Sequence, residues 1–408
     1  MHTTETDRIE TRQERGMKIA ARLKLQKGKC WTVPSQTGTG CYTVDPIGKT
    51  CSCPDFQTRN VTCKHQIAVQ VVLERETKPD GTVIEKVRMT YSQQWTAYDN
   101  AQTHEAERFV ELLSGLCAGI EQPVQTSGRP QLPLSDIVFA LALKTYSTVS
   151  GRRATGYIRN AQSQGFIDHT PHYSSAFRRL ESDDLTPLLK SLIEESARPL
   201  SVVEANFAID STGFSTNTYS RWFDHKWGKM RSEQKWIKLH LMTGTTTNII
   251  TAVEATATES ADAPQLPSLL ASTAQSFAVQ ELSADKAYSS KRNLRAIEAV
   301  GASPFIPFKA GTKPVPTVKA EQDAVWERLW HFYMFRRDDF LAHYHRRSNV
   351  ETTMSMIKAK FGSSVRAKTP IAQVNEVLLK CLCHNVCVLI SSIYELDLEP
   401  VFWHNRIG

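Results

Sequence analysis

The sequence lacks a long uninterrupted apolar run. Its apolar stretches are short and soon broken by charged residues, whereas a membrane-spanning helix needs about 20 consecutive apolar residues. The N-terminal stretch, residues 1–16, is polar, carries both charge signs and lacks the apolar core of a signal peptide. We therefore expect no membrane span and a cytoplasmic protein.

The sequence also lacks an even cysteine count and a net acidic charge. Its nine cysteines cannot all pair, and an odd count in a cytoplasmic chain favours metal binding over a disulfide framework. The 49 lysines and arginines exceed the 42 acids, which gives a net charge of +7. This mild excess fits an ordinary solvated surface, but basic clusters suit phosphate contacts; they lie at 27–29, 152–153, 178–179 and 345–347.

The length of 408 residues, with 41% apolar content, indicates two or three domains. Residues 1–100 contain a charged helix-like stretch (8–24), two strand-like runs (30–36 and 40–45) and an apolar helix-like run (67–74). Glycines between the two strand-like runs predict a hairpin. We expect Cys30 and Cys41, which flank it, to be core residues.

Residues 101–200 show helical periodicity, with apolar residues recurring near every 3.6 positions in 106–120 and 134–146. Several short helices with interspersed arginines fit a helix-turn-helix module for DNA. A plain helical packing or dimerisation domain fits equally well.

Residues 201–408 change to an α/β pattern of three strands, helix, strand, helix, strand and further helices. Two of the strand-like runs end in an acid: Asp210 follows 207–209, and Asp285 follows 282–284. An acid at a strand end can project into a cleft, although a turn or helix-cap aspartate is the ordinary alternative. Asp224 follows no apolar run, so Asp210 is preferred to it.

Four polar residues occupy a segment expected to be one helix: Tyr344, Arg347, Glu351 and Lys358. At about 100° per residue they fall within roughly 60° of one another. A solvated face could produce this pattern, but a metal ion with a phosphate would give the four groups partners. Mg²⁺ prefers oxygen ligands, and two such ions about 4 Å apart can hold both oxygens of an in-line phosphoryl transfer. Three carboxylates can bracket two ions, Arg347 and Lys358 could hold the scissile strand, and Tyr344 could pack there.

The pattern Tyr-x2-Arg-x3-Glu-x6-Lys is matched in full by these four residues. It resembles the signature around the catalytic glutamate in one large group of bacterial insertion-sequence DDE transposases, over about residues 200–395. The resemblance implies a ribonuclease-H-like domain, a mixed sheet flanked by helices, in which Asp210, Asp285 and Glu351 ligate Mg²⁺ (or Mn²⁺). It also implies double-stranded DNA as partner, at element ends and target, and a homo-oligomer on that DNA.

A cysteine cluster in the N-terminal part has the spacing C-x-C-x9-C-x-H. Three thiolates and one imidazole make a closed tetrahedral zinc site, here Cys51, Cys53, Cys63 and His65. The pattern resembles the SWIM zinc finger, a module associated with DNA or protein binding; the residues alone also permit a purely structural site. The second cluster, Cys381, Cys383 and Cys387, lies in an apolar helix, where core packing is expected.

The sequence therefore predicts a small zinc-binding domain (1–100), a helical DNA-binding or dimerisation domain (101–200) and a ribonuclease-H-like catalytic domain (201–408). The expected function is DNA transposition by cleavage at element ends and joining of the 3′-OH to target DNA. A non-catalytic DNA-binding protein derived from such an enzyme and a metal-dependent nuclease on the same fold remain as alternatives.

Overall fold

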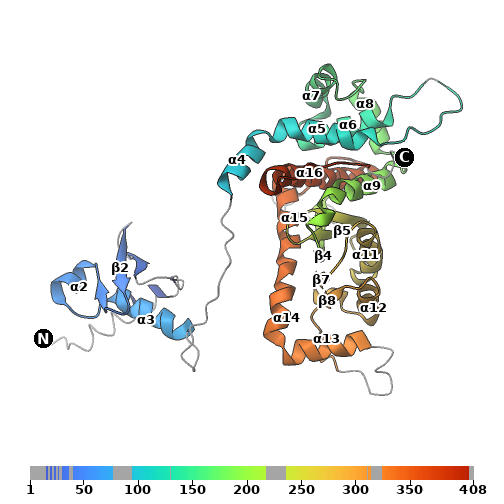
Figure 1. The fold of residues 1–408 in the computed structure, drawn as a ribbon. Helices are drawn as coiled ribbons and strands as arrows, with labels where there is room; N and C mark the ends of the chain where they lie inside the picture. Colours follow the sequence, from blue (N-terminus) through green and yellow to red (C-terminus); the bar gives the residue numbers. More distant parts are fainter. Residues whose placement is uncertain are drawn as a thin grey trace, which may run out of the picture. The chain divides into compact units, whose positions relative to one another are not determined.

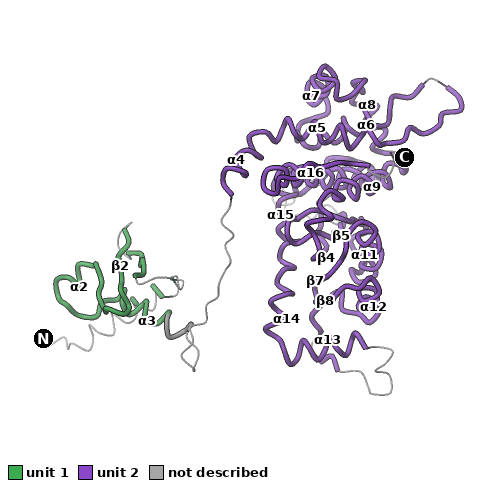
Figure 2. The backbone as a smooth tube through the Cα atoms, viewed as in Figure 1, with its two compact units in different colours: residues 1–92 green, residues 93–408 purple. Residues whose placement is uncertain are grey.

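The computed structural model describes residues 15–16, 19–20, 23, 26, 30–35, 40–76, 94–128, 130–216, 236–309, 311–313 and 324–403. Asp224 and most of the predicted helix at 8–24 lie outside these ranges. The chain divides into two compact units, residues 1–92 and residues 93–408 (Figure 2). Each unit has its own hydrophobic core.

The first unit contains the predicted hairpin. Strands β1 (Trp31–Pro34) and β2 (Cys41–Asp45) pair antiparallel, and β3 (Thr50–Cys51) adds a third strand. Helices α2 (Pro54–Arg59) and α3 (Lys64–Glu76) follow, and α3 confirms the helix predicted at 67–74. The expectation that Cys30 and Cys41 are core residues is wrong, because both are exposed. The alternating pattern of the hairpin instead buries Trp31, Val33 and Val44.

The second unit contains a five-stranded mixed sheet with the order β6-β5-β4-β7-β8. Strands β4 (Asn206–Ser215), β5 (Trp236–Gly244) and β6 (Ile250–Ala257) are antiparallel. Strands β7 (Glu281–Ala284) and β8 (Ser303–Phe305) continue the sheet parallel to β4. The central position of β4 fits its first half, in which Phe207, Ala208 and Ile209 are fully buried.

Helices cover both faces of this sheet (Figure 1). One face carries α11 (Leu266–Ala274) and α12 (Lys291–Ala299), and the other carries α14 (Arg337–Tyr344) and α15 (Ser348–Phe361). Helix α13 (Ala324–Phe335) leads into α14. The fold-class prediction is confirmed: a mixed sheet flanked by helices, preceded by helices and by a small sheet with a Cys/His cluster.

Residues 101–200 are largely helical, as predicted, and the helical part begins before residue 101, at Trp95. The helices are α4 (Trp95–Thr103), α5 (Glu105–Ala118), α6 (Leu134–Tyr146), α7 (Gly151–Ser163), α8 (Tyr173–Leu180), α9 (Leu185–Ala197) and the short 3-10 helix η1 (Arg198–Val202). They share one hydrophobic core with the sheet. The boundary expected near residue 200 stays a prediction.

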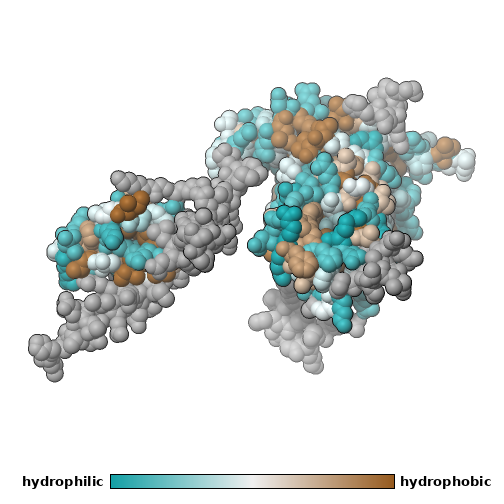
Figure 3. Space-filling model, turned by 60° about the horizontal axis from the view of Figure 1, so that its bottom comes forward, coloured by the Kyte–Doolittle hydropathy of each residue, from teal (hydrophilic) through white to brown (hydrophobic). Residues whose placement is uncertain are grey.

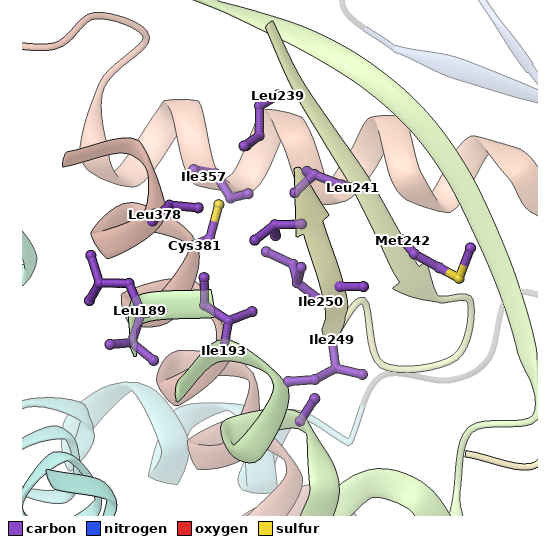
Figure 4. Packing of buried hydrophobic residues seen from close by; sticks show 14 of the residues in the cluster. Leu189, Ile193, Leu239, Leu241, Met242, Ile249, Ile250, Ile357, Leu378 and Cys381 are labelled. Carbon is purple, nitrogen blue, oxygen red and sulfur yellow. The ribbon is translucent and has the colours of Figure 1, made fainter. Parts of the chain in front are cut away.

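Helix α16 (Pro370–Leu396) joins these parts, since it packs against α4, α5, α6, α8, α9, α15 and β6. Figure 4 shows Leu378 and Cys381 of α16 among apolar side chains of α9, β5, β6 and α15. Cys381 and Cys383 are fully buried and Cys387 is half-buried, which confirms core packing for the second cysteine cluster. The Cys383 thiol contacts the carbonyl oxygen of Ala142 at 3.3 Å.

Helix α16 also corrects the expectation that no segment has the length and composition of a membrane span. Its 27 residues include a window with a mean hydropathy of 1.7, but 78% of that window is buried inside the protein. Lys380 and Glu376 interrupt the run, yet the mean stays high because leucine, valine, isoleucine and cysteine surround them. Burial on this scale is typical of a core helix.

Hydrophilic side chains cover much of the face of residues 93–408 seen in Figure 3, and the apolar areas of this face are separate patches.

Candidate active site and zinc centre

Asp210 lies in the middle of β4, and the prediction that it ends the strand is wrong. The strand continues to Ser215 because residues 211–215 keep their antiparallel pairing with β5. The parallel pairing with β7 does end at this level, where Ile209 is the partner of Ala284. Asp210 is therefore the first β4 residue beyond β7, next to the position that Asp285 takes.

Asp285 directly follows β7, as predicted. Its Oδ1 accepts a hydrogen bond from the backbone N–H of Lys286 at 2.5 Å, so it caps the short 3-10 helix η3 (Lys286–Tyr288). Asp285 therefore both caps a short helix, which is the ordinary role of such an aspartate, and lies at the strand end, as predicted. Parallel pairing of β4 and β7 brings Asp210 and Asp285 to the same edge region of the sheet.

Tyr344, Arg347, Glu351 and Lys358 do not share one regular helix. Tyr344 ends α14, Arg347 ends the 3-10 helix η6 (His345–Arg347), and the other two lie on α15. The backbone stays right-handed helical at Tyr344, Arg347 and Ser348. A tighter turn joins the two helices without reversing the chain.

Arg347 connects the strand and the helix of the site. Its Nη1 donates to Oδ2 of Asp210 at 2.7 Å, and its Nη2 donates to Oε1 of Glu351 at 2.5 Å. The Arg347 and Asp210 side chains are 19% and 23% exposed, whereas Glu351 is 55% exposed. A planar guanidinium suits this two-sided contact because its donors have fixed directions.

Negative charge is crowded around Asp210. Burial raises the pKa of the Asp210 carboxyl above its ordinary value, and the neighbouring Asp285 and Glu351 raise it further. The N–H of Ser211, which donates at 2.8 Å, and the Arg347 guanidinium lower it. Carboxylates that repel one another in a partly buried place are stabilised by a cation.

Lys358 points to the same strand from α15. Its Nζ donates to Oγ1 of Thr212 at 2.5 Å, and burial lowers the pKa of the lysine. The Tyr344 ring lies 5.9 Å from the Arg347 guanidinium and stacks on Phe340. The structure therefore brings Asp210, Asp285, Arg347 and Glu351 together. Lys358 reaches β4 from α15 at Thr212, two positions beyond Asp210.

Sequence reasoning missed two residues of this neighbourhood. Thr212 holds Lys358, and nothing in its sequence context marks it. Tyr288 follows Asp285 by three positions and is fully buried, with no hydrogen-bond partner for its hydroxyl among the described residues. Its closeness to an acid at a strand end was the available signal.

In the first unit, Cys51, Cys53, Cys63 and His65 converge as predicted. One ligand atom from each lies within 4.8 Å of the other three, and all four residues are buried. Strand β3 supplies Cys51, Cys53 precedes α2, and Cys63 and His65 lie at the start of α3. Among the described residues, this is the group of histidine, cysteine and acidic side chains that is arranged to hold a metal ion.

The donor chemistry of the cluster fits zinc. Nε2 of His65 is buried without a hydrogen-bond partner among the described residues, and Nδ1 lies 3.9 Å from Sγ of Cys63. Burial raises the pKa values of the Cys51 and Cys63 thiols and lowers the pKa of His65 to about 4. A neutral imidazole with thiols that need a cation to become thiolates is the donor set of a structural zinc site.

Comparison with known protein families agrees with both sites. Residues 204–386 match a family described as the transposase DDE domain, a range that includes Asp210, Asp285 and Glu351. Residues 42–69 match the SWIM zinc finger and include all four zinc-type ligands. The two resemblances seen in the sequence are thus confirmed.

Proposed function

We propose that this chain, which carries a transposase DDE domain and a SWIM zinc finger, binds the ends of its mobile element, cuts the DNA there and joins the 3′-OH to target DNA. The observation that carries the proposal is the gathering of three acids: Asp285, which directly follows β7, and Glu351 on α15 both act on the carboxyl of Asp210 on β4. Arg347 binds Asp210 and Glu351. We further propose that the chain works in the cytoplasm on double-stranded DNA, as a homo-oligomer.

The three carboxylates would hold divalent cations, Mg²⁺ or Mn²⁺. Their oxygen donors suit these ions. Burial, and after it the charges of Asp285 and Glu351, raise the pKa of the Asp210 carboxyl, and a cation would favour its charged form. When bound, such ions stabilise the attacking and leaving oxygens of a phosphoryl transfer. Three carboxylates supply enough oxygen donors to bracket two such ions.

Arg347 and Lys358 would position the DNA strand. Arg347 touches both Asp210 and Glu351, so its guanidinium lies where phosphate oxygens would approach the carboxylates. Lys358 is fixed by Thr212 on the same strand as Asp210. Two positively charged side chains held on rigid elements would orient a phosphodiester and offset the negative charge that develops on it.

The zinc finger would serve as a folded DNA- or protein-binding module. Its four ligands come from three separate segments of a unit with a small core of its own. Metal binding is expected to supply much of its folding free energy.

The test is a supercoiled plasmid carrying the element ends, incubated with the full chain and Mg²⁺. Wild-type protein should cut at the ends and give joined products. Asp285→Asn and Glu351→Gln should bind the DNA without cutting, while Glu399→Gln, an exposed acid of the C-terminal segment, should behave as wild type.

Other results would contradict the proposal in distinct ways. Binding of the ends without any cutting by the wild type would favour a non-catalytic DNA-binding protein. Cutting without joining would favour a nuclease. Full cutting by Asp285→Asn or Glu351→Gln would remove that residue from the catalytic set.

A further inference from the structure

Helices α6 and α7 form a helix-turn-helix arrangement on the part of the second unit farthest from the sheet (Figure 1). Residues 147–150 connect the two helices, and Thr148 within this turn has a left-handed backbone, with φ of 55°. A turn of three to four residues between packed helices is characteristic of DNA-binding modules of this kind. The packing of α7 on α6 and α8 fixes which of its faces is buried.

Helix α7 buries one narrow apolar stripe. Ala154, Ile158 and Ala161 are buried, and their spacing of four and three places them on one side of the helix. Gly151 permits the close packing at its start, since a Cβ there would lie 2.5 Å from the ring of Phe177 on α8. The orientation of α7 is therefore fixed by its neighbours.

The opposite face of α7 is basic and exposed. It carries Arg152, Arg153, Arg159 and Asn160, all exposed, and Tyr157, which is 54% exposed. Residues 151–167 contain no acid. Among the described residues, the three arginines form no ion pair, and Arg152 lies 5.6 Å from the ring of Tyr173 on α8. A helix face with arginines that have no acidic partner, an aromatic ring and an amide fits DNA, whose phosphates and base edges are the usual partners of these groups.

Gly156 lies at the centre of this exposed face. A Cβ at this position would meet nothing within 4 Å, so packing within the chain does not require glycine. Glycine in a helix interior is unfavourable compared with alanine. Gly156 therefore weakens the helix and leaves its outer surface without a side chain. A partner that approaches the helix backbone closely at this position would explain the glycine.

We propose that α7 is the DNA-recognition helix of this protein and that its Arg153–Tyr157–Asn160 face enters the major groove of double-stranded DNA. Its 13 residues span about 20 Å, and the major groove is about 12 Å wide and admits a helix. Residues of the first turns would reach the bases, and Arg152 and Arg159 at the flanks would contact phosphates. The inference deepens the proposed function, on which it rests, by assigning end binding to a surface distinct from the carboxylate site.

The test measures DNA binding by the full chain without added Mg²⁺, using fluorescence anisotropy with an element-end duplex and an unrelated duplex over a range of salt. Arg153→Ala should weaken binding to the element end more than binding to the unrelated duplex, because it removes a base contact. Arg159→Ala should weaken binding to both duplexes and lower the slope of log K against log salt by about one, because it removes a phosphate contact. Arg108→Ala is the matched control, because this exposed arginine on α5 is paired with Glu111 at 2.8 Å. It should bind DNA as the wild type does.

Gly156→Gln separates recognition from folding. Because glutamine favours helix, its melting temperature should equal or exceed that of the wild type, while its affinity for the element end should fall by roughly tenfold. The inference would be overturned if the two single variants, Gly156→Gln and Arg153→Ala, both bound DNA with wild-type affinity. It would also be overturned if these variants changed self-association while their DNA binding stayed the same. If the wild type binds the ends through α7 but never cuts, the transposase proposal fails and this inference stands. If it cuts while the α7 variants bind normally, only this inference fails.

Discussion

Arg347 donates a hydrogen bond to Asp210 over 2.7 Å and thereby joins residues that are 137 positions apart in the chain. The same guanidinium reaches Glu351, four positions along its own segment. This one side chain therefore links the strand and the helix that carry the two acids.

Arg347→Lys should reduce DNA cleavage strongly and stability only modestly. A lysine cannot donate to Asp210 and Glu351 with the fixed fork of a guanidinium, and loss of one positioned donor costs roughly 10² in rate. The effect on unfolding should be about 1 kcal/mol, because one contact is to an exposed acid. Single-turnover cleavage and thermal melting measure the two effects.

The neighbouring Arg346→Lys is its control, since Arg346 binds Glu281 at 2.9 Å instead. Equal loss of cleavage in both variants would show that any arginine-to-lysine change in this segment impairs cleavage, and that the contacts of Arg347 with Asp210 and Glu351 have no special role.

Removing a ligand of the cysteine cluster should release one zinc ion and unfold the first unit. Cys63→Ser leaves three ligands around a site whose buried thiols need the cation. Cys41→Ser, an exposed cysteine on β2 of the same unit, should keep the metal. Zinc content and circular dichroism before and after chelation measure this, and a full zinc equivalent in purified Cys63→Ser would refute the assigned ligand.

Tyr288→Phe should leave stability unchanged or raise it slightly. The hydroxyl of Tyr288 is buried with no hydrogen-bond partner among the described residues, and an unsatisfied buried polar group is unfavourable. Tyr146→Phe gives the contrast, because its hydroxyl donates to Glu105 at 2.8 Å and its loss should cost about 1 kcal/mol. Denaturant unfolding compares the two; a larger loss in Tyr288→Phe would reveal a partner for that hydroxyl.

Lys380 should make stability rise with pH in the alkaline range. It is 2% exposed, and burial lowers its pKa from 10.5 to about 8, although its Nζ donates hydrogen bonds to the carbonyl oxygens of Gly362 and Ser364. Between these two pH values the unfolded chain binds a proton that the folded chain has lost, so unfolding becomes harder as pH increases.

Relative to Lys380→Met, the free energy of unfolding of the wild type should therefore increase by about 3 kcal/mol from pH 8 to pH 10.5. Denaturant unfolding at several pH values measures it, with the exposed Lys368→Met as control. A flat difference between wild type and Lys380→Met across this range would contradict the prediction.

Short sequence spacings predicted those parts of the sites whose residues lie close together along the chain. The Cys51–His65 pattern needs only a hairpin and a helix start to converge, and the pattern from Tyr344 to Lys358 needs only helical backbone. The end of β4 was misplaced because pairing with β5, which no local signal encodes, extends the strand through polar residues. The contacts of Lys358 with Thr212 and of Arg347 with Asp210 are equally non-local. Cys41 was misassigned because the strand alternation, and not residue type, decides which side is buried.

The position of α16 has a consequence for how the protein can fold. Because α16 is buried between the helices of residues 94–197 and the sheet, neither partner has a complete core until α16 is in place. The helical region and the sheet must therefore unfold as a single cooperative block, and a protein cut near residue 200 would expose the apolar surface of α16. The zinc-finger unit has a separate core, so its unfolding does not remove any part of the core that α16 completes.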